Sequence, residues 1–148
     1  MPPVGVDMLP SVIPFRPGPI ARRRRILAVD DDDGLLDMLV LLLDQSHLEL
    51  RTAHDGQAGL ELAAKWDPDL IILDLAMPGI DGATFLERYR RTATSPAPVV
   101  LLTGALDGLT RATELGVAMF LTKPFDLGVL VEIVDAYASP NGQDVALA

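Results

Sequence analysis

The sequence contains no cysteine, which excludes disulfide scaffolds, thiolate zinc sites and cysteine nucleophiles. Long hydrophobic runs are also missing: the longest, such as 38–43 and 70–73, fall far short of the roughly 18 residues that span a bilayer. Basic residues are few, with 12 Lys and Arg against 21 Asp and Glu in 148 residues, for a net charge of −9. We therefore expect a small acidic domain with a cytoplasmic location and no membrane partner.

Proline and arginine are concentrated at the start of the chain. Residues 1–25 hold six of the 12 prolines, five arginines and one acid, so they carry a charge of +4 while the remainder carries −13. Proline at that density blocks helix and sheet hydrogen bonds, which predicts a disordered tail over 1–25. The arginines at 22–25 have no recognition geometry, so no nucleic-acid partner is expected. Residues 26–138 are expected to fold as one domain, followed by a flexible tail over 139–148.

Between residues 26 and 138, short apolar runs alternate with segments of helical spacing. The runs that predict strands occupy 26–29, 48–53, 70–73, 99–102 and 119–121. Between them, apolar residues recur at three- and four-residue steps, as in Leu35, Leu39 and Leu42. Five strands alternating with five helices indicate an α/β fold, a doubly wound five-stranded parallel sheet.

Polar residues follow the predicted strands at the ends where parallel sheets place their binding sites. Four aspartates at 30–33 follow the first strand, Asp74 the third, Thr103 the fourth and Lys123 the fifth. Carboxylates this close raise one another's pKa, and a divalent cation would relieve the repulsion. The pattern predicts a Mg²⁺ site beside an anion.

Phosphoryl transfer is the chemistry that this set of groups fits best. Asp74 can act as a nucleophile and form an acyl phosphate. Mg²⁺ held by Asp31, Asp74 and a backbone carbonyl near Ala76 could bridge one phosphoryl oxygen, while Lys123 and Thr103 each take another. The two histidines, at 47 and 54, fall at a helix end and a strand end on the opposite side of the pattern, and we expect ordinary surface residues there.

Four sequence blocks, ILAVDDD from 26, LDLAMPGIDG from 73, LTG from 102 and LTKPF from 121, resemble the motifs of response-regulator receiver domains. These are the phosphoacceptor parts of bacterial two-component systems. The blocks occur in order, and the resemblance covers residues 26–138. It implies a flavodoxin-like sheet with strand order 2-1-3-4-5.

The resemblance also implies a role for each residue of the site. Asp74 would be phosphorylated by a sensor histidine kinase or a phosphotransfer protein, so the domain would be a phosphoacceptor and not a turnover enzyme. Asp31 would bind Mg²⁺ directly, with Mn²⁺ as an alternative ion, while Asp30 would act through water and Ala76 through its backbone carbonyl. Lys123 would pair with the phosphoryl group.

The same resemblance implies a switch that changes partner binding. Thr103 would move its hydroxyl toward the phosphate, and Phe120 would rotate inward as the switch aromatic. The altered face would comprise the fourth helix, the fifth strand and the fifth helix, and would bind a downstream protein target. The segment from Thr103 to Lys123 is about two residues shorter than the family pattern and contains Gly104 and Gly108. We therefore predict that the fourth helix is short, distorted or mobile.

Two other functions compete with the phosphorylated switch. The first is a degenerate receiver that binds partners without phosphorylation. The second is a haloacid-dehalogenase-like phosphohydrolase, which needs an acid two positions after its nucleophile, where this chain has Ala76. Because only ten residues follow 138, the sequence suggests a stand-alone receiver without an attached effector domain, and an exposed apolar patch on the output face could support a homodimer.

Overall fold

The computed structural model describes residues 22–45, 47–104, 106–117 and 119–138. Residues 1–21 of the tail predicted over 1–25, and all of the tail predicted over 139–148, lie outside this range. Strands and helices alternate along the chain, and their bounds are β1 (Arg24–Val29), α2 (Asp33–Leu43), β2 (Leu48–Ala53), α3 (Gly56–Trp66), β3 (Leu70–Asp74), α4 (Gly82–Thr92), β4 (Val99–Thr103), α5 (Gly108–Glu114), β5 (Met119–Thr122) and α6 (Leu127–Ala138). Among the described helices, none is long and apolar enough to cross a membrane.

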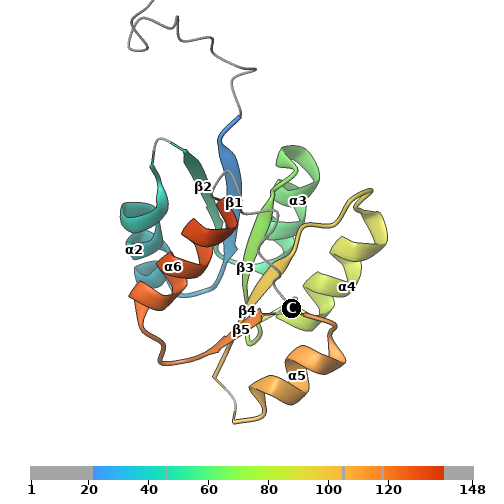
Figure 1. The fold of residues 1–148 in the computed structure, drawn as a ribbon. Helices are drawn as coiled ribbons and strands as arrows, with labels where there is room; N and C mark the ends of the chain where they lie inside the picture. Colours follow the sequence, from blue (N-terminus) through green and yellow to red (C-terminus); the bar gives the residue numbers. More distant parts are fainter. Residues whose placement is uncertain (1–21, 46, 105, 118, 139–148) are drawn as a thin grey trace, which may run out of the picture.

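All strand pairs are parallel, and the sheet order is β2-β1-β3-β4-β5, as predicted. Helices cover both faces of the sheet: α2 and α6 lie on one face, while α3, α4 and α5 lie on the other (Figure 1). Because the sheet is enclosed between helices, its central strands are apolar at nearly every position and β3 and β4 are buried along their whole length.

Two hydrophobic cores form because successive strand residues point to opposite faces. In β1, Leu27 and Val29 pack under α3 and α4, whereas Ile26 and Ala28 pack under α2 and α6. The same alternation continues in β3 and β4. It fixes which side of the sheet each residue at the strand ends faces.

An aspartate directly precedes each of the described helices. The carboxylates of Asp32, Asp55 and Asp81 accept hydrogen bonds from backbone N–H groups three residues later, at 3.1, 2.7 and 2.8 Å. Each satisfies a donor that the first helical turn leaves without an internal partner. Helix α5 differs, because Asp107 before it makes no side-chain capping bond. With seven residues, α5 is short, as predicted, while its distortion or mobility stays a prediction.

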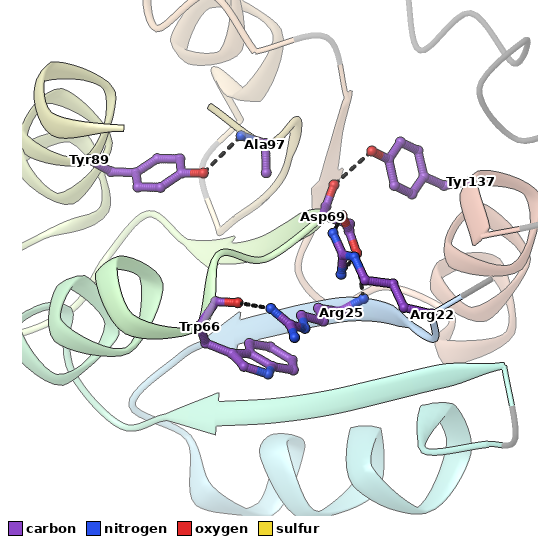
Figure 2. A network of polar contacts seen from close by, with 7 residues as sticks. All are labelled: Arg22, Arg25, Trp66, Asp69, Tyr89, Ala97 and Tyr137. Atoms are coloured by element: carbon purple, nitrogen blue, oxygen red, sulfur yellow. Dashed lines mark hydrogen bonds and ion pairs between the residues drawn. The ribbon is translucent and has the colours of Figure 1, made fainter. Parts of the chain in front are cut away.

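The predicted boundary after residue 25 is wrong, because β1 begins at Arg24. The Arg22 guanidinium donates two hydrogen bonds to the Asp69 carboxylate, at 3.0 and 2.7 Å, and the Arg25 backbone N–H donates a third at 2.8 Å. The Tyr137 hydroxyl donates to the Asp69 backbone carbonyl at 2.7 Å (Figure 2). Composition indicated a tail, but a carboxylate more than forty positions away holds these arginines in the fold.

Candidate functional site

Three aspartates meet at the carboxyl edge of the sheet. Asp30 follows β1 and Asp74 ends β3, and these strands are neighbours with Val29 opposite Leu73. Asp31 completes the group, and one carboxylate oxygen from each residue lies within 4.8 Å of the others. Asp30 and Asp74 are buried, whereas Asp31 is exposed to solvent. The group therefore has a buried floor and one solvent-facing member.

Lys123 adds a positive charge to this group. Its Nζ lies 3.0 Å from Asp30 Oδ2 and 3.4 Å from Asp74 Oδ1. Its backbone N–H donates to the Thr103 carbonyl at 2.6 Å, which ties the end of β5 to the end of β4. The following peptide bond, Lys123–Pro124, is cis. One ammonium is thus shared between two buried carboxylates.

The buried site shifts the pKa of two groups. Burial and, after it, the Asp30 charge raise the pKa of Asp74 to about 6, against the lowering effects of Lys123 and of the Ala76 N–H. Burial alone would lower the pKa of Lys123, but its hydrogen bond to Asp30 and the charges of both aspartates outweigh burial and raise it. Asp74 is therefore ionised above about pH 6 while Lys123 stays protonated.

The donor set fits a hard divalent cation. Three carboxylates lie together and one ammonium contacts two of them, so a negative charge remains to be compensated, and oxygen ligands suit Mg²⁺. The Ala76 N–H donates to Asp74 Oδ1 at 3.3 Å, which places the Ala76 backbone beside the carboxylate. The metal roles of Asp31, Asp30 and the Ala76 carbonyl stay predictions.

A tight loop follows Asp74. The Gly82 N–H donates to the Leu75 carbonyl at 2.9 Å, and a Cβ at Gly82 would lie 2.5 Å from the Asp74 carbonyl oxygen. Only glycine allows α4 to begin so close to the end of β3. Gly82 directly follows Asp81, whose carboxylate caps the first turn of α4.

The predicted switch residues lie on β4 and β5, beside the strand that ends in Asp74. Thr103 ends β4 and is buried, one residue past the position opposite Asp74. Phe120 lies in β5 opposite Leu101 and packs against the core under α3 and α4. Strand alternation therefore brings Thr103 and Phe120 to the face that α5 covers.

One sequence expectation about this edge needs correction. We expected His54 on the side of the fold opposite the aspartates, but it follows β2 at the carboxyl edge and its Nδ1 contacts the Asp33 carboxylate. Strand order explains the error, because β2 is parallel to β1 and ends at the same edge. Asp30 accepts a hydrogen bond from the Lys123 ammonium, and its expected action on the metal through water stays a prediction.

Comparison with known proteins relates this chain to one family. A model described as the response regulator receiver domain matches residues 26–135. Over 115 residues, the chain is 37% identical to the DNA-binding dual master transcriptional regulator RpaA of Synechocystis sp., covering 76% of this chain and 48% of that protein. It is 42% identical over 106 residues to the response regulator PleD of Caulobacter vibrioides, covering 69% of this chain and 23% of that protein.

Solved structures agree with this fold. A putative response regulator from Chloroflexus aurantiacus is 34% identical, with a TM-score of 0.68 over 80% of this chain and 99% of that one. The Vibrio cholerae chemotaxis protein CheY4 is 28% identical, with a TM-score of 0.68 over 76% and 97%. The chain spans about half, or less, of the two curated relatives above, but nearly all of these two structures. This chain belongs to the response regulator receiver domain family.

Proposed function

We propose that this domain accepts a phosphoryl group on Asp74 from the phosphohistidine of a sensor histidine kinase or phosphotransfer protein. The observation that carries the proposal is the Asp74 carboxylate, buried beside two further aspartates and 3.4 Å from the Lys123 ammonium. In the transfer, a carboxylate oxygen of Asp74 forms a bond to phosphorus as the bond between phosphorus and the histidine nitrogen breaks. The histidine nitrogen leaves with its electron pair.

The residues around Asp74 supply charge compensation and positioning, which are the main requirements of phosphoryl transfer. Asp31, Asp74 and the Ala76 carbonyl would hold Mg²⁺ or Mn²⁺, with Asp30 acting through water. When bound, the metal would neutralise charge on the phosphoryl oxygens. Lys123 would turn part of its hydrogen bonding from Asp30 to the phosphoryl group, and the Thr103 hydroxyl would approach another oxygen.

The output is a shift between two conformations. Thr103 and Phe120 lie under α5, so a movement of Thr103 toward Asp74 would alter the packing of α5 on β5. The face formed by α5, β5 and α6 would then change its affinity for a downstream protein target or for a second copy of the chain. The domain acts as a phosphoacceptor in the cytoplasm rather than as an enzyme with many turnovers.

The experiment is incubation with acetyl phosphate and Mg²⁺, followed by intact-mass measurement. Wild type should gain one phosphoryl group, Asp74→Asn should gain none, and the exposed-site control Asp37→Asn should behave as wild type. The kinase route is then tested by replacing acetyl phosphate with phosphorylated histidine kinases. A wild-type protein that no donor labels would overturn the proposal in favour of a phosphorylation-independent interaction module.

A further inference from the structure

Gly108, the first residue of α5, lies directly against both predicted switch residues. It is buried, and a Cβ built on it would lie 3.0 Å from Thr103 Cγ2 and 3.0 and 3.1 Å from two ring carbons of Phe120. Such distances are shorter than ordinary carbon–carbon contacts of about 3.5–4.0 Å. In this conformation, Gly108 therefore has no room for a side chain between α5 and the switch residues.

The two ends of α5 are held differently. Asp107 makes no side-chain capping bond, unlike the aspartates that begin α2, α3 and α4. The other end of α5 is held, because the Arg90 guanidinium donates to the carbonyls of Leu115 and Gly116, the latter at 3.1 Å. The first turn of α5 thus packs on the switch residues through Gly108, while its last turn is hydrogen-bonded to α4.

We propose that Gly108 is a positioning residue that links α5 to the phosphorylation switch. Its lack of a side chain lets α5 contact the Thr103 methyl group and the Phe120 ring directly, so the size of residue 108 sets the balance between the resting and the phosphorylated conformation. The inference rests on the proposed function, because it assumes that Thr103 moves toward a phosphoryl group on Asp74.

The direction of the effect follows from the contacts. In the present conformation, a methyl group at position 108 meets Thr103 and Phe120 at the same time. Movement of the Thr103 side chain toward Asp74 removes one of these contacts. An alanine at 108 therefore disfavours the resting conformation relative to the phosphorylated one. By linkage, a variant that favours the phosphorylated conformation binds a phosphoryl mimic more tightly.

The test measures the binding of beryllofluoride, a mimic of the aspartyl phosphate, by calorimetry in excess Mg²⁺. Gly108→Ala should bind it more tightly than wild type, on the order of 5-fold, the lower end of usual coupling between sites. Affinity for Mg²⁺ alone should be unchanged, because position 108 does not touch the aspartates. The matched control is Gly104→Ala, since a Cβ at Gly104 meets nothing within 4 Å.

A double-mutant cycle separates this coupling from a general effect on the helix. Thr103→Ser keeps the hydroxyl and removes the methyl group that faces Gly108. In the Thr103→Ser background, the gain from Gly108→Ala should fall by at least half. A gain of unchanged size would show that the effect does not pass through Thr103 and would overturn the inference.

The remaining outcomes also decide the matter. If wild type shows no Asp74-dependent binding of beryllofluoride, the proposed function fails and the inference fails with it. If wild type binds and Gly108→Ala matches Gly104→Ala, only the inference fails. If Gly108→Ala does not fold, amide hydrogen exchange of Thr103→Ser is compared with that of wild type instead. Amides in the first turn of α5 should exchange faster in Thr103→Ser, while those of α4 should not change. Unchanged exchange in α5 would contradict the inference.

Discussion

The Lys123 ammonium lies closer to Asp30 than to Asp74, at 3.0 Å against 3.4 Å. The unphosphorylated site therefore keeps its cation on the carboxylate that is not the proposed acceptor. Asp74 retains the weaker contact, and burial raises its pKa to about 6. The shorter ion pair of the site thus involves Asp30, while the proposed acceptor keeps a pKa above its ordinary value.

Removal of the ammonium should slow phosphorylation. In Lys123→Met, the charge that lowers the Asp74 pKa is lost and no ammonium can meet the phosphoryl oxygens. We expect labelling by acetyl phosphate to slow on the order of 10²-fold at pH 7, the usual cost of one stabilising donor. Time-resolved intact mass measures the rate, with the exposed Lys65→Met on α3 as control. Labelling at the wild-type rate would remove Lys123 from the mechanism.

Asp74 should make the domain less stable as the pH rises. Its pKa is about 6 in the folded protein and 3.8 unfolded, so between these values the folded state binds more protons. Unfolding free energy therefore falls as pH rises from about 4 to 6, by up to ~3 kcal/mol from this group. Asp74→Asn should be more stable than wild type at pH 8, with a smaller difference at pH 4. Urea denaturation across this pH range gives the comparison, and a pH-independent difference would contradict it.

The rate of phosphorylation should also depend on the ionisation of Asp74, but it should rise with pH where the unfolding free energy falls. Only the deprotonated carboxylate of Asp74 is nucleophilic, so its reaction with a phosphodonor should slow as the pH falls through the Asp74 pKa, which a bound Mg²⁺ would lower below the metal-free value of about 6. Labelling rates with phosphoramidate and acetyl phosphate should share this midpoint, because they differ in their own ionisation but not in the acceptor. Different midpoints for the two donors would assign the pH dependence to the donors.

Mg²⁺ should stabilise the folded domain through Asp31. This residue is the exposed member of the aspartate group, so its carboxylate can bind a cation with little further desolvation. Thermal unfolding should shift upward with Mg²⁺ concentration in wild type, as expected for a ligand of the native state. The shift should be lost in Asp31→Asn and kept in Asp55→Asn, a helix cap that is not part of the aspartate group. An equal shift in both variants would place the cation elsewhere.

The hydrogen bonds that join Asp69 to Arg22, Arg25 and Tyr137 should contribute to stability without affecting phosphorylation. Asp69→Asn weakens two hydrogen bonds from Arg22 and one from the Arg25 backbone, at the sheet edge opposite Asp74. We expect a loss of about 1–3 kcal/mol of unfolding free energy in urea. Asp44→Asn, which breaks an exposed pair with Arg23, should cost less than about 1 kcal/mol. A change in the Asp74 labelling rate would argue against the separation of the two edges.

Most of the fold could be predicted because its signals are local. Continuous apolar runs such as 70–73 mark buried strands, and capping aspartates such as Asp32 mark helix starts. The grouping of the site aspartates could also be predicted, because each follows a predicted strand and parallel strands bring their carboxyl ends together. The strand order itself came from the resemblance and was confirmed by the sheet pairing.

The features that sequence reasoning missed depend on contacts between distant segments. Arg24 and Arg25 belong to β1 because both pair with β2 and the Arg25 backbone N–H donates to the Asp69 carboxylate. Composition alone does not reveal these contacts. The Lys123 ammonium lies nearer to Asp30 than to Asp74 by a few tenths of an ångström, a difference that no sequence pattern specifies. The role proposed for Gly108 needs the packing of three elements at one point.

The position of Arg22 has a practical consequence. It contacts Asp69 just before β3 begins, whereas Asp74 ends that strand, so Arg22, the first described residue, lies at the end of the sheet opposite the proposed phosphoacceptor. A fluorophore or affinity handle joined upstream of Arg22 would start from that end. Such labels could therefore report on complexes with a kinase without obstructing the approach of its phosphohistidine.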